Sequence, residues 1–180
     1  MRIVSGGQTG ADRAALDAAL EAGVPCGGWC PAGRRAEDGV IPERYPVSEL
    51  PRAGYARRTR QNVLDSDATL IVSFGPPENG SALTLRRCQQ ASKPHLVIDA
   101  NAGTVESAAA DVLAFLRRSH PKTLNVAGPR ASRQPEIYGY VRKLMRIVLS
   151  KAVEGPLFSG TACGAWTAGI APNEGAVRAS

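Results

Sequence analysis

The stretch Ile3-Val4-Ser5-Gly6-Gly7-Gln8-Thr9-Gly10-Ala11-Asp12 determines how the rest of the chain is interpreted. An apolar strand end leads directly into three glycines within five positions, and an Ala/Leu-rich helical pattern follows. Glycines permit positive φ angles and the close approach of a ligand, and the N-terminus of the next helix presents unpaired N–H groups. The stretch therefore predicts a strand, a glycine turn and a helix that bind an anion. A plain tight connection is the alternative.

The glycine spacing of this turn is Gly-Gly-x-x-Gly, which differs from two common nucleotide-binding patterns. The dinucleotide fingerprint requires G-x-G-x-x-G, and a Walker loop requires Gly-Lys-Ser/Thr where this chain has Gly10-Ala11-Asp12. Asp12 either contacts a ligand or acts as a charge partner in the first helical turn. The spacing thus indicates an anion-binding turn of another class.

Length and composition predict one globular domain. The 180 residues are 43% hydrophobic and 21% charged, which suffices to bury about two thirds of the unfolded surface. No apolar run approaches the roughly 18 residues of a membrane span, and no signal-peptide pattern precedes the first strand, so we expect a cytoplasmic protein without membrane contact. The four cysteines lack the spacing of a zinc site, and we expect no metal site.

The positive charge of the chain favours an anionic small ligand over nucleic acid. The net charge is +6, and arginines cluster at several places, including Arg57-Arg58 and Arg86-Arg87. Only 5% of residues are aromatic, and no RNA- or DNA-binding motif accompanies the arginines. We therefore expect solvated helix faces and an anionic ligand, and do not expect a nucleic-acid partner.

Five apolar runs of strand length alternate with five helical patterns. The predicted strands are residues 3–5, 26–30, 69–74, 93–99 and 123–127, and the predicted helices are residues 11–22, 54–65, 82–91, 105–118 and 135–151. This alternation predicts an α/β fold, a Rossmann-like three-layer sandwich whose mostly parallel sheet has helices on both faces. The run 69–74 is the most apolar and is expected in the centre of the sheet.

Two further segments stand apart from this alternation. Residues 31–51 have loop composition apart from a possible short strand at 45–47, and a loop of this length is more often a lid or binding loop than filler. We assign residues 1–152 to a ligand-binding domain and residues 153–180 to a Gly/Ala-rich tail. The tail either drapes over the domain or a neighbouring subunit, or is nearly disordered.

The carboxyl ends of the strands should meet in one crevice, which is where open α/β sheets bind ligands. Three of these ends are turns rich in glycine and hydroxyl groups, and Arg34 and Arg130 flank two of the ends. Each arginine can supply charge-assisted hydrogen bonds of about 1.5–3 kcal/mol to a phosphate. Glu37-Asp38 serves either as an acid/base or ring-edge contact or as a solvated loop turn. No catalytic residue is identified. The candidate ligand-binding residues are Gly6, Gly7, Gln8, Thr9, Gly10, Asp12, Arg34, Gly75, Gly80, Ser81, Thr84, Gly128 and Arg130.

Several segments together resemble the molybdenum-cofactor carrier protein family, a circularly permuted branch of the Rossmann-like superfamily that also contains the cytokinin-activating phosphoribohydrolases. The segments are SGGQTGADRAALD (5–17), GWCPAGR (28–34), AEDG (36–39), Arg58-Thr59, Asn62-Val63, SDATL (66–70) and LNVAGPR (124–130). The resemblance implies a Rossmann-type fold, assembly into homodimers or homotetramers, and binding of a phosphorylated pterin, namely molybdenum cofactor (molybdopterin), or of a nucleotide.

One departure from the hydrolytic relatives bears on function. The phosphoribohydrolases carry Pro-Gly-Gly-x-Gly-Thr-x-x-Glu after a central strand, and the similar stretch here runs from Asn79 to Thr84, with Thr84 at the position of the catalytic glutamate. Without that carboxylate, no group at this turn stabilises an oxocarbenium-like sugar centre. A storage or carrier role without turnover therefore ranks first. A nucleoside-monophosphate N-glycosidase ranks second, and a nucleic-acid or signalling-complex role third.

Overall fold

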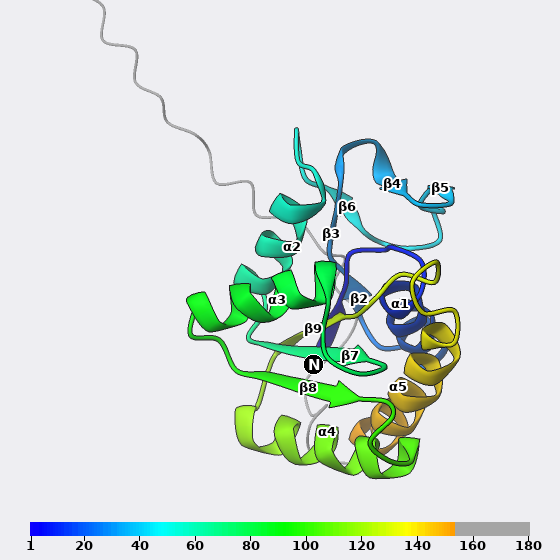
Figure 1. The fold of residues 1–180 in the computed structure, drawn as a ribbon, viewed down its shortest axis with the longest axis vertical. Coiled ribbons are helices and arrows are strands. Elements are labelled where there is room, and N and C mark those ends of the chain that lie inside the picture. Colours follow the sequence, from blue (N-terminus) through cyan, green and yellow to red (C-terminus); the bar gives the residue numbers. More distant parts are fainter. Residues whose placement is uncertain (154–180) are drawn as a thin grey trace, which may run out of the picture.

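The main sheet of the computed structural model contains five parallel strands (Figure 1). The structure describes residues 1–153. In spatial order the strands are β2 (Cys26–Gly27), β1 (Arg2–Val4), β9 (Thr123–Ala127), β7 (Ala68–Ser73) and β8 (His95–Asp99). Every residue of β7 is buried, and β7 pairs with β9 on one side and β8 on the other. The most apolar run is therefore an interior strand, and β9 takes the middle position.

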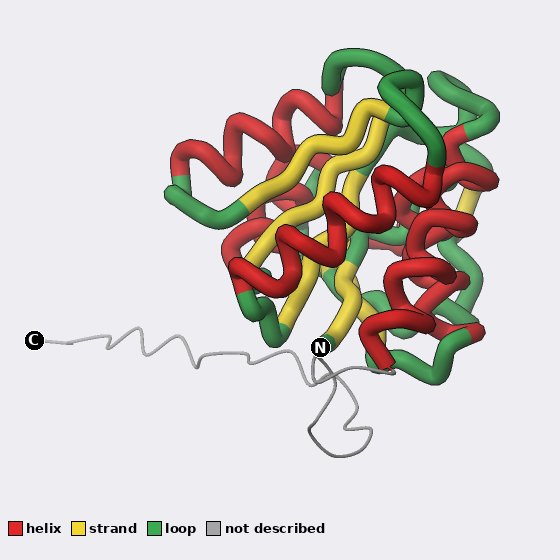
Figure 2. The backbone as a smooth tube through the Cα atoms, turned by 90° about the horizontal axis from the view of Figure 1, so that it is seen from below, coloured by secondary structure: helices red, strands yellow, loops and turns green. Residues whose placement is uncertain are grey.

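Helices cover both faces of this sheet, which confirms the three-layer α/β sandwich (Figure 2). The helices are α1 (Ala11–Glu21), α2 (Tyr55–Leu64), α3 (Asn79–Gln90), α4 (Val105–Ser119) and α5 (Ile137–Val153). Helix α5 packs against both α1 and α4 on one face, and α2 packs against α3 on the other. None of the helices within residues 1–153 combines the length and hydropathy needed to cross a bilayer.

The main core lies between the sheet and the layer of α1, α4 and α5. The alanines of α1 at positions 11, 14, 15, 18 and 19 are fully buried. Small side chains bring the α1 backbone close to the sheet and to α5, whose Leu144, Met145 and Leu149 are also fully buried. Burial of this apolar surface at about 25 cal/mol per Å² is the main favourable term for the fold. The glycine turn before α1 is therefore held by a rigid element.

The predicted strand at 26–30 is divided at Gly28, which corrects the sequence-based interpretation. Gly28 has φ 129°, and a Cβ at this position would lie 2.2 Å from the Ser5 carbonyl oxygen. Beyond it the chain leaves the main sheet, and β3 (Trp29–Cys30) pairs in parallel with β6 (Ser48–Glu49). The short strand expected at 45–47 thus lies at 48–49. The glycine pair in this segment permits the close approach of another backbone.

The segment 31–51 folds around a small core of its own. It contains a 3₁₀ turn (Ala32–Arg34) and an antiparallel hairpin of β4 (Arg35–Ala36) and β5 (Gly39–Val40). Ile41, Tyr45 and Val47 are buried beneath it together with Leu16 of α1. The tip of the hairpin carries Glu37 and Asp38. We call residues 35–40 the hairpin.

Other element boundaries differ from expectation by a few residues. Helix α3 begins at Asn79 rather than at residue 82, because the chain turns into the helix directly after Glu78. Helix α4 begins as predicted, and the Thr104 hydroxyl accepts a hydrogen bond of 3.1 Å from the Ser107 amide as its N-cap. The proposed tail lies beyond the described residues, so its role and the domain boundary at 152 stay predictions.

Candidate ligand-binding cleft

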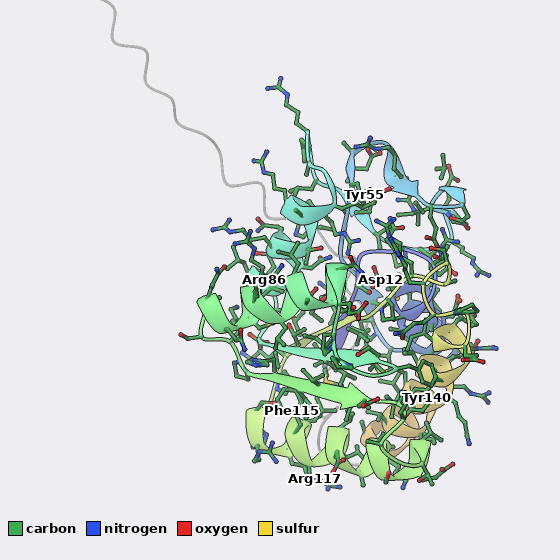
Figure 3. All side chains as sticks on the ribbon, in the orientation of Figure 1. Asp12, Tyr55, Arg86, Phe115, Arg117 and Tyr140 are labelled. Carbon is green, nitrogen blue, oxygen red and sulfur yellow. The ribbon has the colours of Figure 1, made fainter. Side chains whose placement is uncertain are left out.

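A cleft of about 560 Å³ lies at the carboxyl ends of β7 and β9. It is lined by five segments: Gln8 and Asp12 where the opening turn enters α1, Ser73 at the end of β7, the first half of α2, the start of α3, and the loop at 127–134. In Figure 3 the labelled Asp12 and Tyr55 lie toward this side of the molecule, and Arg117 lies on α4 at the opposite side. The volume is within the range of about 300–1,000 Å³ that is typical of small-molecule sites.

The opening turn is shaped by chain packing as well as by access to the cleft. Gly10 has φ 76°, and a Cβ at this position would lie 2.5 Å from the Pro129 carbonyl oxygen. The first amide of α1, that of Ala11, donates to the same carbonyl at 3.2 Å, and the Arg13 amide donates to the Gln8 carbonyl at 3.1 Å. These amides at the N-terminus of α1 thus already donate to acceptors within the protein.

A buried ion pair forms the base of the cleft. Arg58 Nη1 of α2 lies 3.3 Å from Asp12 Oδ2, and the side chains are 11% and 6% exposed. The Gln8 amide also donates to Asp12 Oδ2 at 3.3 Å. Burial raises the pKa of Asp12, whereas the charge of Arg58 and the Gln8 hydrogen bond oppose that rise. A carboxyl group with an elevated pKa therefore faces the cleft.

The space for Arg58 is provided by Gly6. A Cβ at position 6 would lie 1.7 Å from Arg58 Nη1, so the guanidinium rests directly on the backbone of the opening turn. Gly7 has φ 73° and lies against the side chain of Ile41 in the segment 31–51. Neither glycine lines the cleft. Both glycines nevertheless support residues that line it, because Arg58 rests on Gly6 and Gln8 follows Gly7 in the same turn.

Three cleft residues carry buried polar atoms that have no hydrogen-bond partner. Among residues 1–153, four such side-chain atoms occur: Gln8 Oε1, Arg58 Nε, Ser81 Oγ and Arg87 Nε. The first three belong to residues that line the cleft. A buried polar group without a partner costs about 1–3 kcal/mol. Their concentration at one place is typical of a site whose ligand completes the hydrogen bonding.

The start of α3 forms one wall of the cleft. Gly80, Ser81 and Thr84 line it, and Glu78 lies just before the helix. The Thr84 hydroxyl donates to the Gly80 carbonyl at 2.9 Å. The helix dipole adds positive potential at this wall. Gly75, with φ 78°, does not line the cleft, and its amide donates to Asp99 Oδ1 at 2.8 Å.

The loop at 127–134 forms another wall of the cleft and carries two of its three arginines, Arg130 and Arg133. The Arg130 guanidinium lies 4.5 Å from the centroid of the Tyr55 ring in a cation–π contact. Gln134 fixes the loop to the end of β7, since its amide group exchanges two hydrogen bonds of 2.9 Å with the backbone of Phe74. A Cβ at Gly128 would lie 2.5 Å from the Val72 carbonyl oxygen, so this glycine allows close packing of the loop on β7.

Arg34 holds the segment 31–51 together. Its guanidinium donates to four backbone carbonyls, those of Ile41, Pro42, Tyr45 and Val47, at 2.7–3.0 Å. The structure therefore places the Arg34 side chain among loop carbonyls and outside the cleft. Sequence reasoning could not foresee this, because carbonyl acceptors carry no residue signature.

Through Glu37, the hairpin contacts both the opening turn and the loop at 127–134. The Glu37 carboxylate accepts hydrogen bonds from the Thr9 hydroxyl and from the Ser132 hydroxyl and amide. Burial tends to raise the pKa of Glu37, but the hydrogen bonds from Ser132 and Thr9 and the charge of Arg130 outweigh it and hold that pKa below its usual value. Asp38 forms a bidentate ion pair with Arg13. Glu37 and Asp38 are therefore solvent-exposed residues that also make hydrogen bonds and an ion pair with the domain.

The structure brings together about half of the predicted ligand-binding residues. Those that line the cleft are Gln8, Asp12, Gly80, Ser81, Thr84, Gly128 and Arg130, and those outside its lining are Gly6, Gly7, Thr9, Gly10, Arg34 and Gly75. Sequence reasoning missed several lining residues: Tyr55, Arg58, Thr59, Glu78, Arg133 and Gln134. Arg58-Thr59 stood within the family resemblance, which was the one available signal. Within residues 1–153, no cluster of three or more His, Cys, Asp or Glu side chains is arranged to hold a metal ion.

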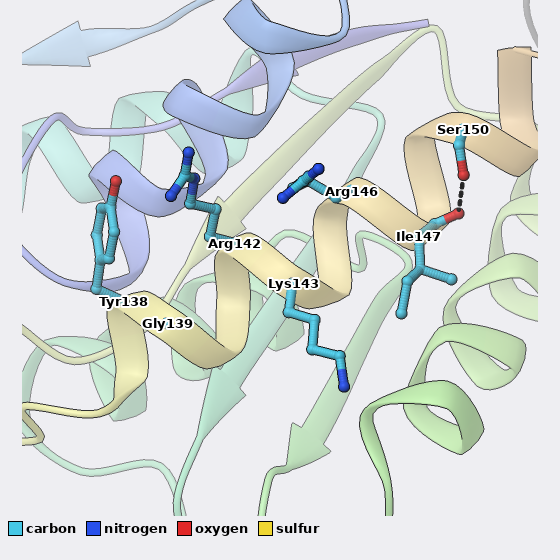
Figure 4. Close-up of a pocket in the computed structure, with 7 residues that line it drawn as sticks. All are labelled: Tyr138, Gly139, Arg142, Lys143, Arg146, Ile147 and Ser150. Carbon is cyan, nitrogen blue, oxygen red and sulfur yellow. Dashed lines mark hydrogen bonds between the residues drawn. The ribbon is translucent and has the colours of Figure 1, made fainter.

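A second cavity, of about 480 Å³, follows the outer side of α5 (Figure 4). Its basic side chains are paired with neighbouring carboxylates: Arg142 and Arg146 with Glu21, and Lys143 with Glu106. None of the unpartnered buried atoms found within residues 1–153 belongs to it. The cleft at the strand ends is therefore the stronger candidate.

Comparisons with known proteins agree with this architecture. A sequence model of the circularly permutated YpsA SLOG family matches residues 3–149. The chain is 49% identical to the protein in a crystal structure named "Putative molybdenum carrier protein", from Syntrophus aciditrophicus SB. That match covers 82% of this chain and 94% of the other, with a TM-score of 0.81. No match was found among curated proteins.

Proposed function

Because the chain belongs to the circularly permutated YpsA SLOG family, we propose that it binds a phosphorylated heterocyclic ligand in the cleft and releases it unchanged. Molybdenum cofactor is the first candidate and a nucleoside monophosphate the second. The similar crystal structure named as a molybdenum carrier supports the first. The observation that carries the proposal is the set of three unpartnered buried atoms on Gln8, Arg58 and Ser81 at the cleft.

The residues of the cleft fit the two parts of such a ligand. Arg130 and Arg133 supply positive charge for a phosphate, and Tyr55 presents a ring against which a flat heterocycle stacks. Gln8 Oε1 accepts from a ring N–H, and Ser81 Oγ donates to a ligand oxygen. Bound molybdenum cofactor would supply the molybdenum centre itself, and the protein groups would hold its pterin and phosphate.

The N-glycosidase alternative rests on the carboxyl groups of the cleft. Asp12, whose pKa is raised by burial, and Glu78 both line it. Thr84 nevertheless occupies the position of the catalytic glutamate of the resembling phosphoribohydrolases. Incubation with AMP and CMP, followed by chromatography of free base, tests this alternative. Steady multiple-turnover base release that disappears in Arg130→Ala would establish an enzyme and overturn the carrier proposal.

Binding itself is tested by calorimetric titration of the protein with AMP, together with native mass spectrometry of freshly purified protein for a retained pterin. We expect an affinity in roughly the micromolar range that weakens as salt rises. Arg130→Ala should weaken AMP binding about tenfold, because one charge-assisted bond is lost. Arg117→Ala, an exposed change on α4 with the same loss of charge, is the matched control. Equal affinities in the two variants would place the ligand elsewhere.

We also propose that the protein forms a homodimer or homotetramer, in line with the family resemblance. Light scattering at micromolar concentration should report a multiple of the chain mass. A single species with the mass of one chain would refute this assignment.

A further inference from the structure

The contacts of Glu37 have the composition of an oxyanion site. Three donors, the Thr9 hydroxyl and the hydroxyl and amide of Ser132, point at its carboxylate. The Ala131 amide donates to Thr9 Oγ1 at 3.2 Å, which orients the Thr9 hydroxyl proton toward Glu37. Hydroxyls, a backbone amide and a nearby guanidinium are the groups that bind phosphate in proteins. We call Thr9, Arg130 and Ser132 the cradle.

The cradle is continuous with the cleft. Arg130 and Ser132 both line the cleft; Ser132 donates to Glu37, the charge of Arg130 acts on Glu37, and Thr9 follows the cleft residue Gln8 in the opening turn. The cradle therefore shares two of its three residues with the lining of the cleft. Glu37, which is exposed, is the one group of residues 1–153 seen to occupy the cradle as an anion.

Glu37 is carried by a short hairpin with few attachments at its tip. The hairpin has strands of only two residues each, and its tip is attached to the domain through Glu37 and through the ion pair of Asp38 with Arg13. Its base is fixed more firmly, since Ile41 is fully buried and Arg34 donates to four carbonyls. Release of the tip thus leaves the segment 31–51 folded.

We infer that the cradle is the phosphate subsite of the cleft, that Glu37 occupies it as an internal stand-in for phosphate, and that an incoming phosphate monoester displaces Glu37 and leaves the hairpin tip held by the Asp38–Arg13 ion pair alone. The inference rests on the proposed function for the identity of the ligand but not for the anion exchange. Ligand binding is thereby coupled to loosening of the hairpin tip. The apparent affinity for phosphate is reduced by the fraction of molecules in which Glu37 holds the cradle.

The experiment compares the full chain with Glu37→Gln and Glu43→Gln. Glu43 is an exposed acid in the same segment outside the cradle, so its change of charge is matched. Each protein is titrated with inorganic phosphate and, separately, with AMP. Glu37→Gln should bind phosphate about tenfold more tightly than wild type, the gain expected if Glu37 leaves the cradle about a tenth of the time. Glu43→Gln should bind as wild type does.

Hydrogen exchange provides the second measurement. In wild type, saturating phosphate should speed exchange of the amides of residues 36–39, whereas chloride at equal ionic strength should not. Unchanged phosphate affinity in Glu37→Gln, or protection of the hairpin by phosphate, would overturn the inference. If AMP still binds the wild-type protein under either of those outcomes, the proposed ligand-binding function stands without the anion exchange at Glu37. If phosphate exchanges with Glu37 but AMP binds no more tightly than phosphate, the cradle stands and the heterocyclic ligand is refuted.

Discussion

Replacing Gly10 by alanine tests how tightly the opening turn is packed against the loop at 127–134. The backbone of Gly10 has φ 76° and ψ −128°, a region that residues with a side chain rarely occupy. The added Cβ would lie 2.5 Å from the Pro129 carbonyl oxygen and 2.7 Å from the Ala131 nitrogen. Both neighbours are backbone atoms, so no side chain can rotate away to make room.

The expected loss of stability follows from two costs. Backbone strain contributes about 1–3 kcal/mol, and the enforced shift of the loop contributes about 1–3 kcal/mol. A total of about 4 kcal/mol corresponds to a decrease in Tm of roughly 12 °C for a domain of this size. The shift also moves Arg130 and Ser132, so phosphate binding should weaken in parallel.

The control for this variant is Gly23→Ala, which introduces a side chain at φ 64° with no atom within 4 Å of the new Cβ. This control variant should lose stability through backbone strain alone, by about 1–2 kcal/mol. Thermal and urea unfolding of both variants, followed by far-ultraviolet circular dichroism, gives the comparison. Equal losses in the two variants would refute the contact with Pro129 as the reason for glycine at position 10.

Three further predictions concern side chains around the cleft and α1. Glu37→Gln should be less stable than wild type at pH 7. Because a lowered pKa stabilises the fold only while the carboxylate is ionised, the difference should shrink as the pH falls below 4.5 and be lost as the pH falls through the lowered pKa of the folded state; thermal unfolding over a pH series from 7 downward measures it. Tyr138→Phe removes a 2.8 Å hydrogen bond to the buried Asp17 carboxylate, so the free energy of unfolding measured in urea should fall by about 1.5 kcal/mol. A decrease below a few tenths of that value would show that this hydrogen bond does not stabilise the fold. Gln134→Ala leaves the amide and carbonyl of Phe74 unpaired and should cost about 2 kcal/mol while weakening AMP binding; undiminished AMP affinity would show that the loop does not need this anchor.

The alternation of strands and helices was predictable because it depends on local patterns. The run 69–74 is mostly apolar, with Leu70, Ile71 and Val72 in succession, and such a run is typical of a strand buried on both faces of a sheet. The helix cap at Thr104 was likewise predictable from one residue type and its position. Fold class and most element positions therefore followed from the sequence.

The cleft was only partly predictable because its parts depend on contacts between distant segments. Gly6 was assigned to ligand binding, yet it accommodates Arg58 from a helix some fifty residues away. The helical pattern of α2 marked Arg58 as a surface residue, since a buried ion pair with Asp12 leaves no trace in hydropathy. Arg34 was assigned to an anion for its charge, whereas its geometry is decided by four carbonyls of a loop without regular structure.

The strand order of the main sheet has a consequence for biosynthesis. β1 and β2 form one pair and β7 and β8 another, and the two pairs are joined only through β9, which follows more than 120 residues after the start of the chain. While the chain emerges from the ribosome, the edges of β1 and β7 that pair with β9 stay unpaired until residue 127 has left the exit tunnel. The sheet can therefore be completed only after nearly the whole described domain has been synthesised. Chaperones that bind exposed strand edges should accordingly bind mainly to nascent chains of intermediate length.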